Sequence, residues 1–333
     1  MHEGIVKPRA LKPGDTIKII APSSITSAKL NLPKAVNFLI KSGFKVSLSS
    51  VMQRKSATRY FTTVGDRERL TEIEEAFKSD EIAGIMVLRG GSGAIDLLNM
   101  IDYQVIREHP KVFIGYSDIT FLQMAFLSKA GLVTFHGPML IDLAEEDQGI
   151  VKYNFDTLMR MVSGKEMLTL RNPADVKWSR TIVDGKAQGR LLGGNLSVLS
   201  MLANTQFMPD SAGSIVFAED VDLEPWEVDN MLTSLVIKDF FSKANGVFFG
   251  EFPPYDLGEV ASTVSRSAFV EDYLETAIGD VIYDIVTKRI KDVPSFMDFT
   301  CCHGRHITTL PLGVKVEMDA KNREVTMLES AVD

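Results

Sequence analysis

The sequence has few cysteines and no long apolar segment, and both absences limit what the protein can be. Only two cysteines occur among 333 residues, Cys301 and Cys302, and they are adjacent. Neighbouring cysteines rarely form a disulfide because the required geometry strains the peptide between them. Two ligands also cannot complete a four-ligand zinc site, and no stretch approaches the roughly 20 apolar residues of a membrane span. We therefore expect reduced, partly buried thiols, no metal or other cofactor, and no membrane partner.

The sequence also lacks a basic cluster and an apolar N-terminal segment. The formal net charge is −8, from 36 Lys and Arg against 44 Asp and Glu, whereas a duplex-binding protein normally has a basic face. Residues Met1–Gly4 carry an early acid and are followed by no apolar stretch, unlike a secretory signal. We expect a cytoplasmic protein that binds no nucleic acid.

The first half of the sequence alternates apolar segments with amphipathic ones. The patterns predict strands at 16–22, 44–49, 84–88 and 112–114, and helices at 34–41, 66–77 and 119–129. Continuous apolar strands that alternate with helices are typical of a parallel sheet covered on both faces. The expected fold class is therefore α/β.

The composition changes after about residue 150. Residues 165–190 are polar and irregular, and strands, helices and a hairpin are then expected at 213–218, 226–241, 246–250, 281–290 and 314–328. We predict an N-terminal parallel-sheet α/β domain over residues 1–150, a linker region over 151–185, and a smaller mixed α/β C-terminal domain over 186–333.

A strand-to-helix turn in the first domain carries the candidate nucleophile, Ser117. The apolar strand 112–114 is followed by Gly-Tyr-Ser-Asp at 115–118 and then by a helical pattern. This order resembles a nucleophile elbow, in which a sharp turn exposes the serine hydroxyl, although Ile119 replaces the second glycine of G-x-S-x-G. Taken alone, the segment rather favours a simple helix cap by Ser117 or Asp118.

Backbone N–H groups near Ser117 are candidates for stabilising negative charge. The N–H of Asp118 would lie at the start of a helix, where the dipole favours an anion. Gly90 and Gly91 follow the apolar strand 84–88 and could supply a second N–H. The same glycine-rich segment also suits a flexible turn, and its spacing fits neither G-x-G-x-x-G nor a P-loop.

The general base must come from a small set of histidines. The chain has five: His2, His109, His136, His303 and His306. None stands out by its chemistry, and the pair at 303 and 306 has no nearby third ligand for a metal. A histidine base usually needs an acid behind it. Glu219 and Asp220 are best placed because acids at strand ends often line clefts in α/β folds, although they could instead cap the next segment.

Seven ordered segments together resemble the LD-carboxypeptidases, or muramoyltetrapeptide carboxypeptidases, a family that includes the microcin-immunity peptidases. These segments are 11–15 with 21–24, 89–91, 110–120, 135–139, 193–196, 219–221, and 303–304 with 309–313. The resemblance implies a triad of Ser117, His303 and Glu219, with oxyanion donors from Asp118 and from Gly90 or Gly91. It also implies an N-terminal domain that carries the nucleophile and a C-terminal domain that supplies Glu219 and His303.

The activity implied by the resemblance is that of a serine carboxypeptidase. Such an enzyme would release terminal D-alanine from cytoplasmic murein tetrapeptide, and the family is commonly dimeric, so we expect a homodimer whose partner is a small peptide or muropeptide. Two alternatives stay open. One is the same chemistry on a peptide–nucleotide antibiotic or another amide conjugate, and the other is a non-enzymatic two-domain protein that binds a small molecule.

The sequence departs from the family pattern around the expected substrate pocket. Ser92 replaces the usual tyrosine, Asp96 stands where many members have arginine, and Trp226 lies where tyrosine and arginine are common. Cys301 and Cys302 replace the usual small residue or glycine before the histidine. We expect Ser92, Asp96 and Trp226 to contact the substrate. An acid in place of a base near the pocket would disfavour a substrate carboxylate.

Overall fold

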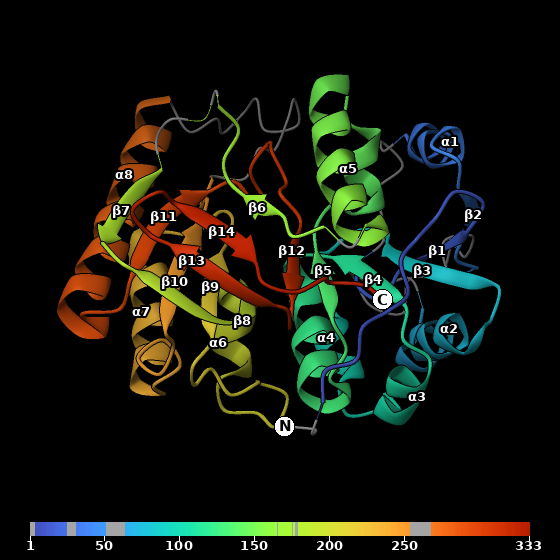
Figure 1. The fold of residues 1–333 in the computed structure, drawn as a ribbon, viewed down its shortest axis with the longest axis horizontal. Coiled ribbons are helices and arrows are strands. Elements are labelled where there is room, and N and C mark those ends of the chain that lie inside the picture. The colour runs from blue at the N-terminus through green and yellow to red at the C-terminus, as the bar shows by residue number, and fades with distance from the viewer. Residues whose placement is uncertain are drawn as a thin grey trace.

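Two sheets organise the described part of the chain, the first built mainly from the N-terminal half of the sequence and the second from the C-terminal half (Figure 1). The structure is a computed structural model that describes residues 4–24, 31–50, 64–164, 166–174, 176, 179–253 and 268–333. Met1 to Glu3, whose composition argued against a secretory signal, lie outside these ranges. Among the described residues, no helix has the length and apolar composition needed to cross a membrane.

The N-terminal sheet is parallel except at one edge. Its strand order is β12-β5-β4-β3-β1-β2, and every neighbouring pair is parallel apart from β12 and β5. The strands are β1 (Thr16–Ile20), β2 (Lys45–Ser47), β3 (Ile82–Val87), β4 (Val112–Gly115), β5 (Thr134–His136) and β12 (Leu310–Leu312). Every residue of β3 is buried, as expected for a strand covered on both faces. The predicted parallel-sheet α/β domain is confirmed.

Helices cover both faces of this sheet. They are α1 (Leu32–Lys41), α2 (Asp66–Lys78), α3 (Tyr103–Glu108), α4 (Thr120–Ala125) and α5 (Gln148–Ser163). In Figure 1, α1 and α5 lie above the sheet, and α2, α3 and α4 lie below it. The helix predicted at 119–129 is α4 together with a π turn, Phe126–Ala130.

The C-terminal domain is built on a mixed sheet. Its order is β6-β14-β13-β8-β9-β10-β11-β7, with β8 to β11 parallel and the remaining pairs antiparallel. The strands are β6 (Thr169–Leu170), β7 (Arg180–Val183), β8 (Lys186–Asn195), β9 (Ile215–Glu219), β10 (Gly246–Gly250), β11 (Ser295–Phe299), β13 (Lys315–Asp319) and β14 (Glu324–Met327). The predicted mixed α/β domain and its terminal hairpin, β13–β14, are confirmed.

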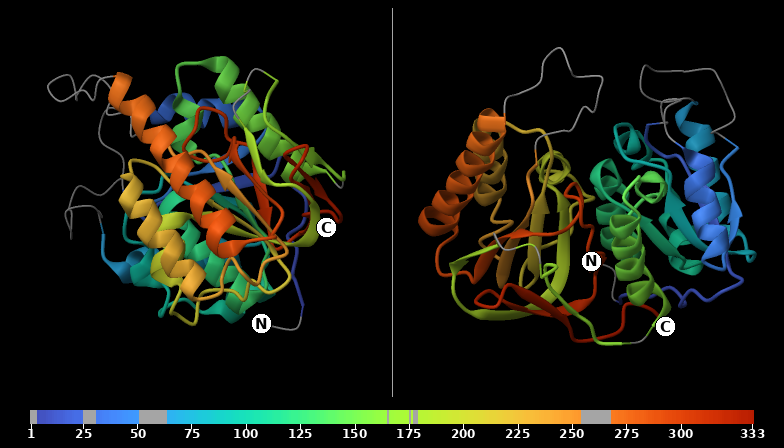
Figure 2. Two further views of the ribbon diagram at one scale, coloured as in Figure 1. Left: turned by 90° about the vertical axis from the view of Figure 1, so that its left-hand side faces the viewer. Right: turned by 90° about the horizontal axis from the view of Figure 1, so that it is seen from above.

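Among the residues that the structure describes, three α-helices accompany this second sheet. They are α6 (Leu196–Leu202), α7 (Pro225–Ile237) and α8 (Ala268–Ile285), with a π turn, Val286–Ile290, after α8. Figure 2 shows α7 and α8 side by side on the outer side of the domain, away from the N-terminal half.

The segment between the domains is more ordered than its polar sequence indicates. Residues 151–185, predicted as a linker region, contain most of α5 as well as β6 and β7. Helix α5 packs on the N-terminal domain, where Phe155 meets Phe38 of α1 edge to face at 5.0 Å. Strands β6 and β7 form the two edges of the C-terminal sheet. Strand β12 crosses in the opposite direction and pairs with β5 of the N-terminal sheet.

The two domains touch where α4 packs against β8. Gly194, near the end of β8, has φ +147°, and an added Cβ would lie 2.5 Å from Thr120 Cγ2. The N–H of Asn195 donates a hydrogen bond of 3.1 Å to Thr120 Oγ1. Since Asn195 is also in register with Glu219 on β9, this contact places the end of β9 beside the start of α4.

An aromatic stack supports β9, the strand that ends at Glu219. Phe248 is fully buried, and its ring lies nearly parallel to those of Phe217 and Phe296, at centroid distances of 5.4 and 5.2 Å.

We predict that Phe248→Ala lowers the free energy of unfolding by about 3–5 kcal/mol, because the cavity cannot close within a stacked core. Urea denaturation measures the change. The control is Ile237→Ala on α7, whose side chain is 74% exposed and whose loss should change stability by less than about 0.5 kcal/mol. Equal effects of the two substitutions would contradict the proposed packing.

Candidate active site

Ser117 lies on a strained turn between β4 and α4. Its φ is +65°, a left-handed conformation that costs a residue other than glycine on the order of 1–3 kcal/mol and is concentrated at functional sites. The turn is the short 3-10 segment Ser117–Ile119. Gly115 permits it, because an added Cβ there would lie 2.9 Å from Ile119 Cγ2. The turn therefore has the backbone of a nucleophile elbow, with Ile119 packed on Gly115.

The glycine turn after β3 approaches the hydroxyl of Ser117. A Cβ added to Gly90 would lie 2.9 Å from Ser117 Cβ and 3.0 Å from its Oγ. Gly91 has φ +116°, and an added Cβ would lie 2.3 Å from Ser24 Oγ. Only glycine lets this backbone approach so closely. The structure thus brings Gly90 beside the predicted nucleophile and packs Gly91, the next residue of the turn, against Ser24.

The side chain of Asp118, the other predicted oxyanion residue, fastens this turn to the elbow. Its Oδ2 accepts hydrogen bonds from Ser23 Oγ and, at 2.9 Å, from the N–H of Ala94. Burial raises the pKa of Asp118, and these hydrogen bonds oppose that rise. The carboxylate is therefore occupied with structural bonds, and only the backbone N–H of Asp118 remains for a substrate.

Arg69 holds the same turn from the other side and was missed in the sequence. It belongs to α2 and is 1% exposed, and its guanidinium donates to the carbonyls of Pro22 and, at 2.8 Å, Gly93. Asp96 lies 3.7 Å from it. Asp96, expected to contact the substrate, is thus ion-paired with Arg69. The sequence did contain a signal for the burial of Arg69, because this residue lies one helical turn before Ile73, on the apolar face of the predicted helix.

His303 and Glu219 form a close pair that joins the C-terminal segments. Glu219 ends β9 and is fully buried, and its Oε2 lies 2.6 Å from His303 Nδ1. The ring of His303 also meets the ring of Tyr116, the residue before Ser117, at 5.0 Å and 75°. The structure therefore pairs His303 with Glu219 and brings the ring of His303 against the residue that precedes the predicted nucleophile.

Charge sets the protonation of this pair. Burial alone would lower the pKa of His303, but the charge and hydrogen bond of Glu219, with further attraction from Asp220 and Asp142, raise it above the ordinary value of 6.5. For Glu219, burial alone would raise the pKa, but the charge of His303 together with the contacts to His303 and His136 outweighs that effect and lowers it. Glu219 therefore carries a negative charge beside the imidazole of His303.

The two acids proposed from the sequence have different partners. Glu219 contacts His303, whereas Asp220 accepts hydrogen bonds from Asn195 Nδ2 at 2.8 Å and from Ser197 Oγ at 2.6 Å. Asp220 therefore caps the start of α6, and the sequence alone had left both roles open for both residues. In the described part of the chain, no hydrogen bond joins Ser117 to His303, and such contacts often tighten only when substrate binds.

The remaining predicted residues lie nearer the surface. Ser92 is exposed, and its N–H donates to Ser24 Oγ at 3.1 Å. Trp226 is 64% exposed at the start of α7. His306 packs its ring against Tyr153 at 4.9 Å. Glu219 also belongs to a group of three buried side chains, with His136 and Cys302, whose ligand atoms lie within 4.8 Å of one another.

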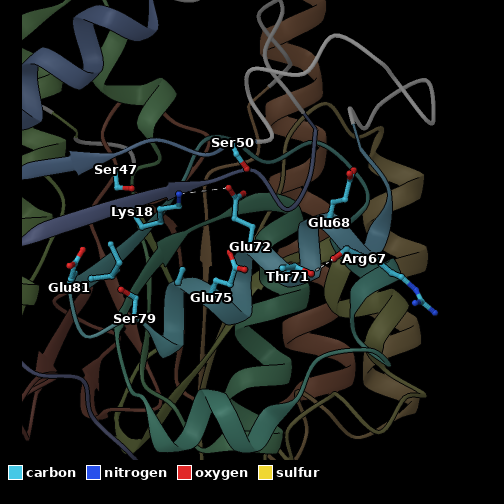
Figure 3. A pocket seen from close by; sticks show the side chains of 12 residues that line it. Lys18, Ser47, Ser50, Arg67, Glu68, Thr71, Glu72, Glu75, Ser79 and Glu81 are labelled. Carbon is cyan, nitrogen blue, oxygen red and sulfur yellow. Dashed lines mark hydrogen bonds and ion pairs between the residues drawn. The ribbon is translucent and has the colours of Figure 1, made fainter.

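A hollow of about 540 Å³ elsewhere in the N-terminal domain contains none of the predicted triad residues (Figure 3). It lies between α2 and the strands β1 and β2, and Lys18 and Glu72 face each other across it at 4.0 Å. The candidate active site is therefore assigned from side-chain chemistry, because the size of a hollow says nothing about nucleophiles and bases.

The gathered groups suit acyl transfer. A serine on a strained turn, a histidine oriented by a buried carboxylate, and nearby backbone N–H groups are the parts that such chemistry needs. The fold and this site together define a two-domain α/β protein of the hydrolase type.

Comparison with known proteins identifies the family. The LD-carboxypeptidase N-terminal domain matches residues 17–137, and the LD-carboxypeptidase C-terminal domain matches residues 188–318. The chain belongs to the LD-carboxypeptidase family. It is 32% identical over 328 residues to a probable murein peptide carboxypeptidase of Bacillus subtilis, covering 98% of this chain and 95% of the relative. It is 28% identical to the microcin C7 self-immunity protein MccF of Escherichia coli, with coverage of 98% and 96%.

Solved structures agree with this assignment. MccF in complex with glutamyl sulfamoyl guanosine superimposes with a TM-score of 0.82 at 26% identity, covering 98% of this chain and 99% of that one. A muramoyltetrapeptide carboxypeptidase from Oxalobacter formigenes gives a TM-score of 0.75 at 25% identity, with coverage of 94% and 97%.

We predict that His303 titrates above 6.5 and that Glu219→Gln moves its pKa below that value. Gln removes the negative charge, whereas the burial that disfavours the imidazolium remains. Proton-detected NMR of the histidine rings measures both values. The pKa of His136 should fall in the same variant, since the charge of Glu219 opposes the lowering of that pKa by burial. An unchanged His303 titration in Glu219→Gln would contradict the electrostatic role given to the carboxylate.

We also predict that Gly90→Ala slows labelling of Ser117 by a fluorophosphonate about 100-fold, because the new methyl group displaces the hydroxyl. Labelling rates are followed by mass spectrometry. Gly65→Ala is the matched control, since a Cβ there would meet nothing within 4 Å. Similar rates for the two variants would show that the approach of Gly90 to Ser117 does not matter for reactivity.

Proposed function

We propose that the protein is a serine carboxypeptidase that cuts an amide between an L-centre and a D-residue, and that it releases terminal D-alanine from murein tetrapeptide. The observation that carries the proposal is the buried Glu219–His303 pair, in which His303 packs against Tyr116, the residue before the strained Ser117. The similarity to a probable murein peptide carboxypeptidase supports the substrate class.

The proposed reaction proceeds through an acyl-enzyme. His303 takes the proton of Ser117 Oγ, which attacks the carbonyl carbon, and the negative charge that develops on the carbonyl oxygen is stabilised by N–H groups of Asp118 and of Gly90 or Gly91. His303 then donates its proton to the leaving amine, so the C–N bond breaks and D-alanine departs. Water, deprotonated by His303, attacks the ester and frees Ser117.

Glu219 determines which ring nitrogen of His303 exchanges the proton in the proposed reaction. Its contact with Nδ1 of His303 leaves Nε2 as the nitrogen that faces the substrate side. Its negative charge also stabilises the imidazolium that forms after proton transfer. A fully buried carboxylate does this well because no solvent competes for its charge.

Substrate contacts are proposed for the residues at the rim. Ser92 and Trp226 are exposed and available to a peptide. Asp96 would affect the substrate only indirectly, by positioning Arg69, with which it forms an ion pair. A cytoplasmic location and a homodimer are proposed from the family resemblance, and the two free thiols agree with a reducing compartment.

A second candidate keeps the chemistry and changes the substrate. The close superposition on MccF bound to glutamyl sulfamoyl guanosine favours a peptide–nucleotide conjugate or another amide as substrate. The third reading, a binding protein without catalysis, is tested by the fluorophosphonate labelling above, since a pure binder has no reason to activate Ser117.

We predict that Ser117→Ala and His303→Ala each lower the rate of D-alanine release by about 10⁴-fold or more, and that the double variant is hardly slower, because the two residues act as a unit. Amino-acid analysis of murein tetrapeptide digests measures the release. Ser128→Ala is the control, as this serine lies in the π turn after α4 and should leave the rate unchanged.

Equal D-alanine release by Ser117→Ala and the unaltered protein would overturn the proposed mechanism. A panel that contains murein tetrapeptide, aminoacyl sulfamoyl nucleosides and simple peptide amides then separates the two substrate proposals. Hydrolysis of the nucleosides alone would favour the second candidate.

A further inference from the structure

A second group of buried side chains lies behind the Glu219–His303 pair. Nε2 of His136, Sγ of Cys302 and a carboxylate oxygen of Glu219 all lie within 4.8 Å of one another. None of the three residues is more than 1% exposed. They come from β5, from the loop before His303, and from the end of β9, so that both domains contribute to the group.

The hydrogen bonds around His136 determine which nitrogen carries its proton. The side chain of Gln123 donates from Nε2 to the carbonyls of Gly115 at 2.9 Å and Phe135 at 3.0 Å. Its Oε1 must then face Nδ1 of His136, 3.2 Å away, as an acceptor. The proton of the neutral ring therefore lies on Nδ1, and Nε2 presents a lone pair to the group.

The three ligand atoms share a single proton, that of the Cys302 thiol. The thiol of Cys302 lies 2.8 Å from His136 Nε2 and donates to it, because that nitrogen presents a lone pair. Glu219 Oε1 lies 3.7 Å from the same nitrogen and has no hydrogen-bond partner among the described residues. A buried carboxylate oxygen without a hydrogen-bond donor is unfavourable. A cation placed between the three side chains would supply the missing partner.

We propose that His136, Cys302 and Glu219 form a binding site for one soft divalent metal ion, with Zn²⁺ as the ion that suits it best. Imidazole, thiolate and carboxylate are the ligands that zinc takes in proteins, at about 2.0–2.3 Å. Tetrahedral angles at those bond lengths separate ligand atoms by roughly 3.3–3.8 Å. The His136–Glu219 separation of 3.7 Å already fits, and Cys302 needs to move away from His136 by less than about 1 Å.

Charge balance favours the bound state. Binding breaks the S–H bond of Cys302, forms a zinc–sulfur bond and releases the proton to solvent. Zn²⁺ then faces one thiolate and one carboxylate, so the buried group is neutral overall, and the oxygen of Glu219 that lacks a donor gains a partner. A neutral, fully paired group avoids the penalty that a buried single charge carries.

The bound ion would inhibit the proposed reaction, and this consequence rests on the proposed function. Zn²⁺ would bind the same carboxylate whose other oxygen holds His303 Nδ1 at 2.6 Å. Glu219 would then orient His303 less firmly and stabilise less well the imidazolium proposed to form in the reaction. The site itself stands on the contacts of the three side chains and does not depend on catalysis.

The test is zinc binding by the metal-free full-length chain, measured by competition with a chromophoric chelator. We expect one ion per chain. Loss of an outer partner of a metal ligand already costs about 10- to 100-fold in affinity, so Cys302→Ser, which removes a ligand, should cost about 100-fold or more. Cys301→Ser is the matched control, a neighbouring buried thiol outside the group, and should bind like the unaltered chain.

Two further measurements keep the test decisive. Cys302→Gly suits the backbone, since φ at this position is +76°, and it should fold normally by circular dichroism and also lose zinc. Co²⁺ in place of Zn²⁺ should give a thiolate charge-transfer band in the unaltered chain and in Cys301→Ser, but not in either Cys302 variant. Absence of the band in the unaltered chain, or equal zinc affinity in Cys302→Gly, would overturn the site.

Inhibition is measured separately from binding. Zn²⁺ at one equivalent should slow D-alanine release by the unaltered chain and by Cys301→Ser, whereas the fractional slowing should be lost in Cys302→Gly. If the chain hydrolyses no amide, the proposed function fails while the binding and Co²⁺ measurements still decide the metal site. If it hydrolyses murein tetrapeptide but binds no zinc, only the metal site fails.

Discussion

The close contact between Thr120 and Gly194 is the constraint on which the site depends. The predicted nucleophile lies in one domain and its base and acid in the other, so the geometry requires a fixed seam between them. Gly194 provides it because a side chain there would overlap Thr120, and the hydrogen bond from Asn195 to the Thr120 hydroxyl sets the register. Thr120 is the third residue after Ser117, and β8 pairs with β9. Elements from both domains thus converge on one point.

At the contact between the domains, the burial of Glu219 determines how its negative charge must be matched. Glu219 is held without solvent, so its charge must be matched by neighbouring groups, and His303 supplies the match on one side of the carboxylate. The other oxygen lies near His136 and Cys302 and has no hydrogen-bond partner among the described residues. The same carboxylate therefore orients the proposed base and leaves one oxygen without a partner, which connects the proposed chemistry with the proposed metal site.

Local sequence patterns predicted the parts of the structure that depend on neighbours in the chain. The apolar segments of β3 and β4 indicated a covered parallel sheet, and Gly115 with Ser117 indicated a tight turn. The triad came from the family resemblance. Contacts between segments that are distant in the sequence could not be predicted from local patterns. Nothing in Leu310–Leu312 indicates pairing with β5, the polar β6 and β7 gain their order from sheet edges, and the contacts of Arg69 with Pro22 and Gly93 join segments distant in sequence.

Strand β12 has a consequence for how the molecule is made. The N-terminal sheet receives its last strand from residues 310–312, and the chain end returns to the same domain, where the N–H of Asp333 donates to the carbonyl of Pro8. During synthesis on the ribosome, one edge of β5 therefore stays without its partner strand until residues 310–312 have emerged. A nascent chain that has just completed Ser117 also lacks Glu219 and His303, so the first sheet and the proposed triad are both completed late in synthesis.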